Sequence, residues 1–170
     1  VLIYEAAMTT KAGIFGTAPI VKIQPAPPIT EKRKYERMWE KKEYRVVAPG
    51  EDCAQVFLQQ ARPKKGAKVI DLGCGTGRGG FMLAFLGGMD VTMVDFAGNC
   101  LDDEIKPMLE TQKHVLRFME ADLTKPLLVN AEYGFCTDVM EHIPPQDVDK
   151  VLDNALHACQ HVFFQISTVD

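Results

Sequence analysis

Short apolar runs alternate with segments of helical periodicity through most of the chain. The runs are rich in branched and aromatic residues, and they lie at 69–72, 90–95, 115–123, 132–143 and 160–167. Their length and composition predict buried strands, the fourth of which includes its exit loop. Apolar residues at helical spacing predict helices after the first strand, over 99–112 and over 148–159. Strands that alternate with helices favour a doubly wound, Rossmann-like α/β domain with a mostly parallel sheet, and we expect the strand order 3-2-1-4-5.

The chain divides into three regions by pattern. Residues 1–30 have no clear period and are rich in proline, which predicts an extended arm. Residues 31–65 are expected to form a helical cap, because aromatic residues at helical spacing predict an amphipathic helix over 31–44 and a second short helix follows. Residues 66–170 hold the alternating pattern and form the predicted core domain.

The segment 31–45 holds seven basic and four acidic residues. One interpretation is a helix that contacts nucleic acid. We favour a solvated face with ion pairs between successive turns, with Tyr35 and Trp39 covering the core. Nucleic acid is therefore not the expected partner, whereas the arm is a candidate for contact with a protein or with a second copy of the chain.

The chain of 170 residues has a formal net charge of -4, is 46% hydrophobic and has 25% charged residues, as in ordinary globular proteins. No apolar run approaches the roughly 18 residues of a membrane-spanning helix, so no membrane contact is expected. The five cysteines form no C-x-x-C pair, and several lie in apolar runs. We expect reduced thiols in a cytoplasmic protein, with neither a disulfide frame nor a zinc site.

The most informative stretch is 67–80, AKVIDLGCGTGRGG, in which a buried strand is predicted to run into a helix through a glycine-rich turn. Glycine lets a backbone turn sharply and lets a ligand approach closely. The following helix presents free N–H groups and the positive end of its dipole. We therefore expect a ligand to bind at this turn.

Two ligand classes fit the glycines. Gly75, Gly77 and Gly80 match the G-x-G-x-x-G pattern of dinucleotide-binding proteins. Asp95 follows at the distance of a ribose-binding acid, which would suit an NAD-dependent oxidoreductase. In the other register, Asp71 lies just before the first glycine of the turn. An acid there is unfavourable beside a pyrophosphate but favourable beside an ammonium or sulfonium ion.

The sequence of 69–77, VIDLGCGTG, resembles the first motif of class I S-adenosylmethionine-dependent methyltransferases, and further motifs in the same order extend the resemblance over 66–167. It implies S-adenosyl-L-methionine as the cofactor and S-adenosyl-L-homocysteine as the product. It also implies that Asp71 and the glycine loop hold the methionyl part of the cofactor. The loop residues concerned are Gly73, Cys74, Gly75 and Gly77.

Acids at the ends of the next two strands extend this implied site. Asp95 would accept hydrogen bonds from the ribose hydroxyls, and Phe96 would lie against the adenine ring. Asp122 would accept from the adenine amino group, and the backbone N–H of Leu123 would meet a ring nitrogen. The alternatives are an N-cap role for Asp95 and a turn-forming role for Asp122.

In this family an N-terminal helix often closes over the cofactor. The segment 31–44 would supply that helix here. Tyr35, Trp39, Tyr44 or Arg45 would then contact the cofactor, and the Arg45 guanidinium would pair with the methionyl carboxylate.

The exit loop of the fourth strand supplies the candidate catalytic residues. Asp138, Glu141, His142 and Ile143 resemble the D-x-x-E-H-I/V loop of the family's small-molecule branch, rather than loops of base methylation. The acceptor is therefore expected to be a small molecule with a nucleophilic O, N or C atom. His142 would act as a general base or hold the loop in place, beside Glu141 and Asp138, which is also a candidate cofactor contact. A metal ion also suits these side chains but is not expected, because the resemblance accounts for them.

The sequence departs from the family at its end. A family member would continue with a further helix and two more strands that complete the acceptor pocket. We expect either a partial chain or a small variant whose sheet edge is covered by the arm or by another subunit. A non-catalytic binding or assembly protein with this fold is the alternative to a methyltransferase.

Overall fold

The structure is a computed structural model that describes residues 30–167, so the arm predicted over 1–30 lies outside the described residues except for Thr30. Five parallel strands form one sheet with the order β3-β2-β1-β4-β5, as the sequence predicts. The strands are β1 (Lys68–Leu72), β2 (Asp90–Asp95), β3 (Leu116–Glu120), β4 (Ala131–Thr137) and β5 (Cys159–Gln165). The central strand β1 is buried at all but its first residue, which explains its unbroken apolar character.

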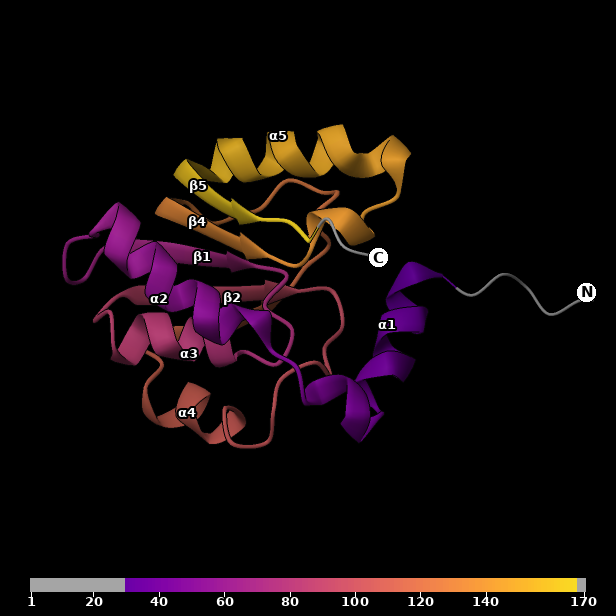
Figure 1. Cartoon of the computed structure of the whole chain (residues 1–170), viewed down its shortest axis with the longest axis horizontal. Helices are drawn as coiled ribbons and strands as arrows, with labels where there is room; N and C mark the ends of the chain where they lie inside the picture. Colours follow the sequence, from indigo (N-terminus) through magenta and orange to yellow (C-terminus); the bar gives the residue numbers. More distant parts are fainter. Residues whose placement is uncertain (1–29, 168–170) are drawn as a thin grey trace, which may run out of the picture.

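Helices cover both faces of the sheet (Figure 1). One face carries α2 (Pro49–Ala61), α3 (Arg78–Phe85) and α4 (Lys106–Thr111), and the other carries α5 (Val148–Ala158). Two apolar clusters fill the space between the helices and the sheet. In the first cluster the ring of Phe57 from α2 has its centroid 5.7 Å from those of Phe135 and Phe163. These two layers of helices confirm the predicted doubly wound fold.

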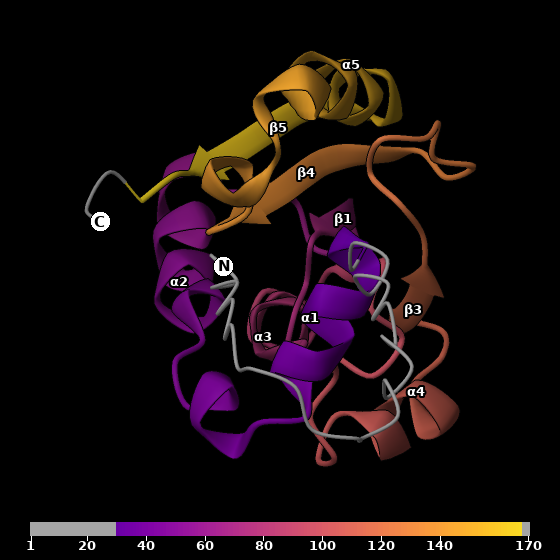
Figure 2. The same cartoon turned by 90° about the vertical axis from the view of Figure 1, so that its right-hand side faces the viewer.

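A short helical cap stands across the carboxyl ends of the strands (Figures 1 and 2). Its first helix is α1 (Glu31–Trp39), which begins after Thr30 because the Thr30 hydroxyl accepts a hydrogen bond from the Arg33 backbone. A 3₁₀ turn, η1 (Lys42–Arg45), completes the cap before the chain enters α2. None of the helices within 30–167 combines the length and the apolar character needed to cross a membrane.

Two predicted helices are shorter in the structure. The helix expected over 31–44 ends at Trp39, and the chain continues into η1. The helix expected over 99–112 begins only at Lys106. Pro107 lies at its start, where a residue without an N–H is tolerated, and this explains why the preceding residues form turns.

Three smaller differences concern strand ends and one exposed side chain. β3 ends at Glu120, so Asp122 lies in the following turn and not in the strand. Cys159, expected at the end of a helix, opens β5. Leu156 belongs to the apolar stripe of α5 but is 54% exposed, because it lies at the margin of the face that packs on the sheet.

Candidate functional site

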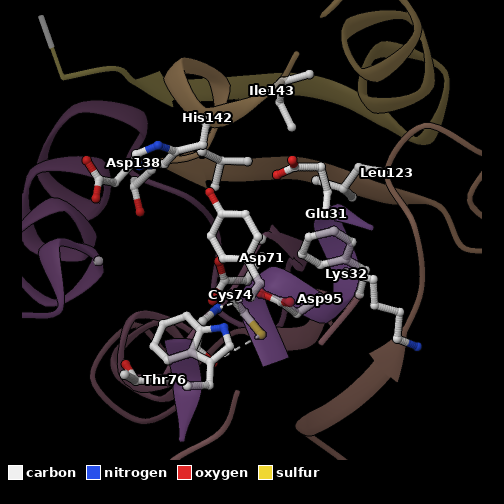
Figure 3. Close-up of a pocket in the computed structure, with 18 of the residues that line it drawn as sticks. Glu31, Lys32, Asp71, Cys74, Thr76, Asp95, Leu123, Asp138, His142 and Ile143 are labelled. Carbon is white, nitrogen blue, oxygen red and sulfur yellow. Dashed lines mark hydrogen bonds between the residues drawn. The ribbon is translucent and has the colours of Figure 1, made fainter. Parts of the chain in front are cut away.

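A cavity of about 590 Å³ lies between the cap and the carboxyl ends of the strands (Figure 3). Open parallel sheets bind their ligands at this edge. The walls are formed by the cap, by the glycine loop with the ends of β2 and β3, and by the exit loop of β4. Carboxylates dominate the charged residues of the lining, with Lys32 as the one Lys or Arg among the described residues that line it. The carboxylates are Glu31, Glu43, Asp71, Asp95, Asp122, Asp138 and Asp147. This excess of negative charge favours a ligand with positive charge.

The loop that follows β1 leaves no room for a side chain at its first two glycines. Gly73 has φ +76°, and a Cβ atom there would stand 2.5 Å from Val139 of the exit loop. Gly75 has φ +50°, and a Cβ atom there would stand 3.0 Å from the Trp39 ring. Because L side chains are strained at such φ values, glycine allows the loop to lie between the exit loop and the cap. Both glycines and Cys74 line the cavity.

Gly77 lies at the end of the glycine loop and does not itself line the cavity. It precedes α3 with φ +81°, and a Cβ atom there would stand 2.7 Å from Leu101. Gly77 therefore allows α3 to pack closely on the segment after β2. The cofactor contact expected for Gly77 stays a prediction.

Asp71 brings a buried carboxyl group to the cavity. Its side chain is 3% exposed and comes from the buried end of β1. Burial, followed by repulsion from Asp95, raises the pKa of Asp71 to about 7, although a hydrogen bond from the Gly80 backbone opposes the rise. A cationic ligand would favour the ionised form of this carboxyl group.

Asp95 lies opposite Asp71 at the end of β2, and Figure 3 shows both beside Cys74. Its Oδ2 accepts a hydrogen bond from the Gly75 backbone at 3.1 Å, and its Oδ1 accepts one from the Ala97 backbone at 2.9 Å. A carboxylate has about four acceptor sites, so it can still accept from two ligand hydroxyls. Burial raises the pKa of Asp95, against backbone hydrogen bonds that lower it. No helix begins directly after Asp95, so it caps a turn and not a helix.

Phe96, Asp122 and Leu123 also line the cavity, at the ends of β2 and β3. The centroid of the Phe96 ring lies 5.5 Å from that of Tyr35 in the cap, so two aromatic rings face the same part of the cavity. The Asp122 Oδ1 accepts a hydrogen bond from the Thr124 backbone at 2.8 Å. Asp122 therefore acts as a turn former and, at the same time, presents an acceptor at the cavity.

The exit loop of β4 carries Asp138 and His142 to the opposite wall (Figure 3). Asp138 has φ +57°, a conformation that aspartate tolerates better than most residues. Burial, followed by repulsion from Glu141, raises the pKa of Asp138. The His142 ring has its centroid 6.5 Å from that of Tyr35, so the base proposed from the sequence lies next to the cap.

Glu141 lies beside Asp138 and does not itself line the cavity. Its Oε1 accepts a hydrogen bond from the Ser167 backbone beyond the end of β5. Its Oε2 is buried with no hydrogen-bond partner within residues 30–167. A short 3₁₀ turn, η2 (Met140–His142), carries both Glu141 and His142, and the catalytic role expected for Glu141 stays a prediction.

Arg45 does not reach the cavity either. Its guanidinium donates to the carbonyl oxygens of Trp39 and Asn99 and to the carboxylate of Asp102. With these donors engaged, Arg45 is not available to pair with a ligand carboxylate inside the cavity. The structure therefore does not place Arg45 at the cavity where the methionyl contact is expected, whereas Tyr35, Trp39 and Tyr44 do line the cavity.

The sequence profile of the family described as "Methyltransferase domain" matches residues 69–161, more than half of the chain. The chain belongs to this methyltransferase family. The match spans the strands and loops that build the cavity, from β1 to the start of β5. A search of curated proteins finds no match.

Solved structures with a similar fold include methyltransferases and one other enzyme. Coclaurine N-methyltransferase, bound to N-methylheliamine and S-adenosylhomocysteine, matches with 17% identity and a TM-score of 0.56, over 68% of this chain and 35% of that chain. Magnesium protoporphyrin IX methyltransferase from Synechocystis PCC 6803, with bound S-adenosylmethionine, matches with 20% identity and a TM-score of 0.55, over 81% of this chain and 63% of that chain. The (4+2)-cyclase SpnF matches with 13% identity and a TM-score of 0.56, over 64% of this chain and 40% of that chain. The chain thus spans only part of the length of each, and these likenesses show a shared fold.

One part of the cavity wall was not found from the sequence. Pro49 and Gly50, to which the sequence analysis assigns no role, line the cavity at the start of α2. A Cβ atom on Gly50 would stand 3.3 Å from the backbone of Gly79 at the start of α3. The N-termini of α2 and α3 therefore meet at the cavity because both residues are glycine. The Pro-Gly pair in the sequence does not by itself indicate this contact with Gly79.

Cys74, Asp95 and Cys100 form a compact group beside the glycine loop. One potential ligand atom from each lies within 4.8 Å of the others. Burial, together with the neighbouring Cys100, raises the pKa of the Cys74 thiol well above its ordinary value.

Proposed function

We propose that this chain binds S-adenosylmethionine in the cavity under the cap and transfers its methyl group to a small molecule. The observation that carries the proposal is the convergence of Asp71, the glycine loop and Asp95 on one cavity. An acid at the end of β1 suits the ammonium and sulfonium groups of this cofactor, and an acid at the end of β2 suits a ribose diol. The membership in a methyltransferase family supports the same cofactor.

The proposed binding mode assigns a role to each wall. Asp71 and the backbone of the glycine loop hold the methionyl part. Asp95 accepts from the two ribose hydroxyls. Phe96 and Tyr35 enclose the adenine ring, and Asp122 accepts from its amino group.

The transfer itself asks for alignment and the exclusion of water, because a sulfonium ion is already a strong electrophile. The cap covers the cavity with Tyr35, Trp39 and Tyr44, which supply an apolar wall against solvent. Burial raises the pKa of Tyr35 to about 12, so its phenol stays neutral there. We assign His142 as the general base that removes a proton from the acceptor, and Asp138 as its neighbour in the loop.

A small molecule is the acceptor that the exit loop favours. Its D-x-x-E-H-I sequence resembles that of small-molecule methyltransferases. The names of proteins with a similar fold refer to such acceptors, among them phosphoethanolamine in the Haemonchus contortus enzyme. The class of nucleophile, O, N or C, stays open in the proposal.

Methyl transfer can be tested with S-adenosylmethionine labelled on its methyl group. The chain is incubated with fractions of a small-molecule extract, and in parallel with DNA and RNA. The proposal predicts that label appears in one small-molecule fraction together with an equal amount of S-adenosylhomocysteine, and that Asp95→Ala lowers both signals when the cofactor is not saturating. Label in DNA or RNA would contradict the acceptor class, and cofactor binding without transfer to any acceptor would contradict the proposed reaction.

A second function on the same fold is favoured by one observation, the structural likeness to a (4+2)-cyclase. That likeness shows that a fold of this kind also serves a reaction whose name implies no methyl transfer. The same experiment separates the two functions. Consumption of an extract component without formation of S-adenosylhomocysteine would point to the second.

A further inference from the structure

Arg45 joins the cap to the segment that follows β2 through its entire guanidinium group. Nε donates to the Trp39 carbonyl at 2.7 Å, within the cap itself. Nη2 donates to the Asn99 carbonyl at 2.6 Å, and Nη1 donates to the Cys100 carbonyl at 2.7 Å and to Asp102 Oδ1 at 3.1 Å. Nη1 also lies 3.2 Å from the Leu101 carbonyl, so one side chain joins the end of α1 to four successive residues of the core, 99–102.

Asp102 connects this contact to the helix behind the glycine loop. Its carboxylate is 8% exposed, and its second oxygen accepts from Arg78 Nε at 2.7 Å. Arg78 is the first residue of α3, and its Nη1 lies 3.6 Å from Glu51 at the start of α2. Removing one partner of a nearly buried carboxylate is destabilising, so the cap and the start of α3 share one charge network.

The remaining contacts of the cap are light. No residue of α1 or η1 is buried. Outside the Arg45 network, the polar contacts to the core are the ion pair of Lys32 with Glu120 and the hydrogen bond from Asn99 Nδ2 to the Glu36 carbonyl. The apolar contacts come from the rings of Tyr35 and Trp39, which pack against the core from the inner face of the cap. The connection to α2 is exposed, because Val46 and Val47 are 72% and 73% accessible to solvent.

We propose that Arg45 is the latch of a lid. The lid consists of residues 30–45, it turns about 46–48, and it must open for the cofactor to enter and to leave. Trp39 and Tyr35 form the inner face of this lid, so a cofactor in the cavity stabilises the same closed state as the latch. Arg45 is thus a positioning residue that acts through the lid, and this inference rests on the proposed cofactor site.

The chain carries a built-in reporter, because Trp39 is its only tryptophan. Stopped-flow fluorescence of the full chain with S-adenosylhomocysteine gives the association and dissociation rate constants. Hydrogen bonds from a charged group stabilise the closed lid, and Arg45→Gln removes most of them. This variant should therefore raise the dissociation rate constant about tenfold or more. The association rate constant should be unchanged or higher, because the lid is then more often open.

Arg37→Gln is the matched control. The side chain of Arg37 is exposed on α1 and makes no hydrogen bond or ion pair within the described range. The association and dissociation rate constants of Arg37→Gln should therefore equal those of the wild type. Arg45→Lys keeps the charge but not the planar fork, and should lie between the wild type and Arg45→Gln. Asp102→Asn tests the latch from the core side and should also raise the dissociation rate constant. Thermal melting confirms that each variant is folded.

Amide hydrogen exchange of the ligand-free chain tests the latch separately from the proposed cofactor binding. The latch predicts faster exchange in 30–45 for Arg45→Gln than for Arg37→Gln, with the exchange of the sheet unchanged. Equal exchange and equal dissociation rate constants in the two variants would overturn the latch. A wild type that binds no S-adenosylhomocysteine would overturn the proposed function, and the exchange measurement would then decide the latch by itself.

Discussion

The indole ring of Trp39 lies against the backbone of Gly75: a Cβ atom at position 75 would stand 3.0 Å from Cη2 and 3.1 Å from Cζ2 of the ring. The cap therefore meets the glycine loop at a point where only a hydrogen atom fits. This contact closes the cavity over Asp71 and Asp95, which lie on either side of the loop.

Gly75→Ala should weaken cofactor binding more than its effect on stability explains. The new methyl group must displace Trp39, and overpacking of this size corresponds to a loss of roughly tenfold in the affinity for S-adenosylhomocysteine. Gly66→Ala is the matched control, because Gly66 has φ +80° with no atom within 4 Å of a Cβ position. Both variants should lose about 1–2 kcal/mol of stability from backbone strain. Thermal melting and calorimetric titration measure the two effects, and equal affinities in both variants would contradict the closed cap.

Asp71 should make the stability of the ligand-free chain depend on pH. Its pKa is about 7 in the folded chain, because burial and then Asp95 raise it, against an ordinary value of 3.8. Between these two values the folded state binds more protons than the unfolded state, so the contribution of Asp71 to the free energy of unfolding falls as pH rises. Asp71→Asn should remove this fall, whereas Asp103→Asn, at an exposed position, should not. Chemical denaturation at a series of pH values measures the slopes, and parallel slopes in wild type and Asp71→Asn would contradict the burial of this group.

The same pKa predicts proton release on binding. A cationic ligand favours ionised Asp71, so S-adenosylmethionine should displace protons from the wild type at about pH 6. Calorimetry in buffers of different ionisation enthalpy measures the number released. Asp71→Asn should release correspondingly fewer protons. An equal number from both proteins would remove Asp71 from the proposed site.

His142 should affect turnover and leave cofactor affinity nearly unchanged. A general base contributes on the order of 10²–10⁴ in rate, so His142→Ala should lower kcat by at least about a hundredfold once an acceptor is known. His142→Gln keeps a polar side chain in the loop and should show the same loss if proton removal is the role. Restored turnover in His142→Gln would assign His142 a structural role in the exit loop.

The fold could be predicted because the signals for it are local. Branched residues mark the strand β1 in the sequence itself, and the alternation with helices restricts the strand order. Asp71 and Asp95 were also found from the sequence, because acids at the ends of neighbouring parallel strands must lie at the same edge of a sheet.

The positions of Arg45 and Glu141 depend on contacts that no local pattern carries. The partners of Arg45 in the core lie 54 to 57 residues further along the chain, and only the folded chain brings the carbonyl of Asn99 within reach. Glu141 and His142 are adjacent in sequence, but a single 3₁₀ turn points one toward Ser167 and the other toward the cavity. The short α4 follows from Pro107, whose effect on a helix depends on whether it falls at the start or in the middle.

The most direct test of the account is calorimetric titration of the chain with S-adenosylmethionine, S-adenosylhomocysteine and NAD, in parallel with the variant Asp95→Ala. The account predicts saturable binding of the first two ligands and none of NAD. Loss of hydrogen bonds to a charged acceptor should weaken binding to Asp95→Ala by about tenfold to a hundredfold, with its fold checked by melting. Binding of NAD, or wild-type affinity in Asp95→Ala, would contradict the central claim that this cavity holds the adenosyl cofactor.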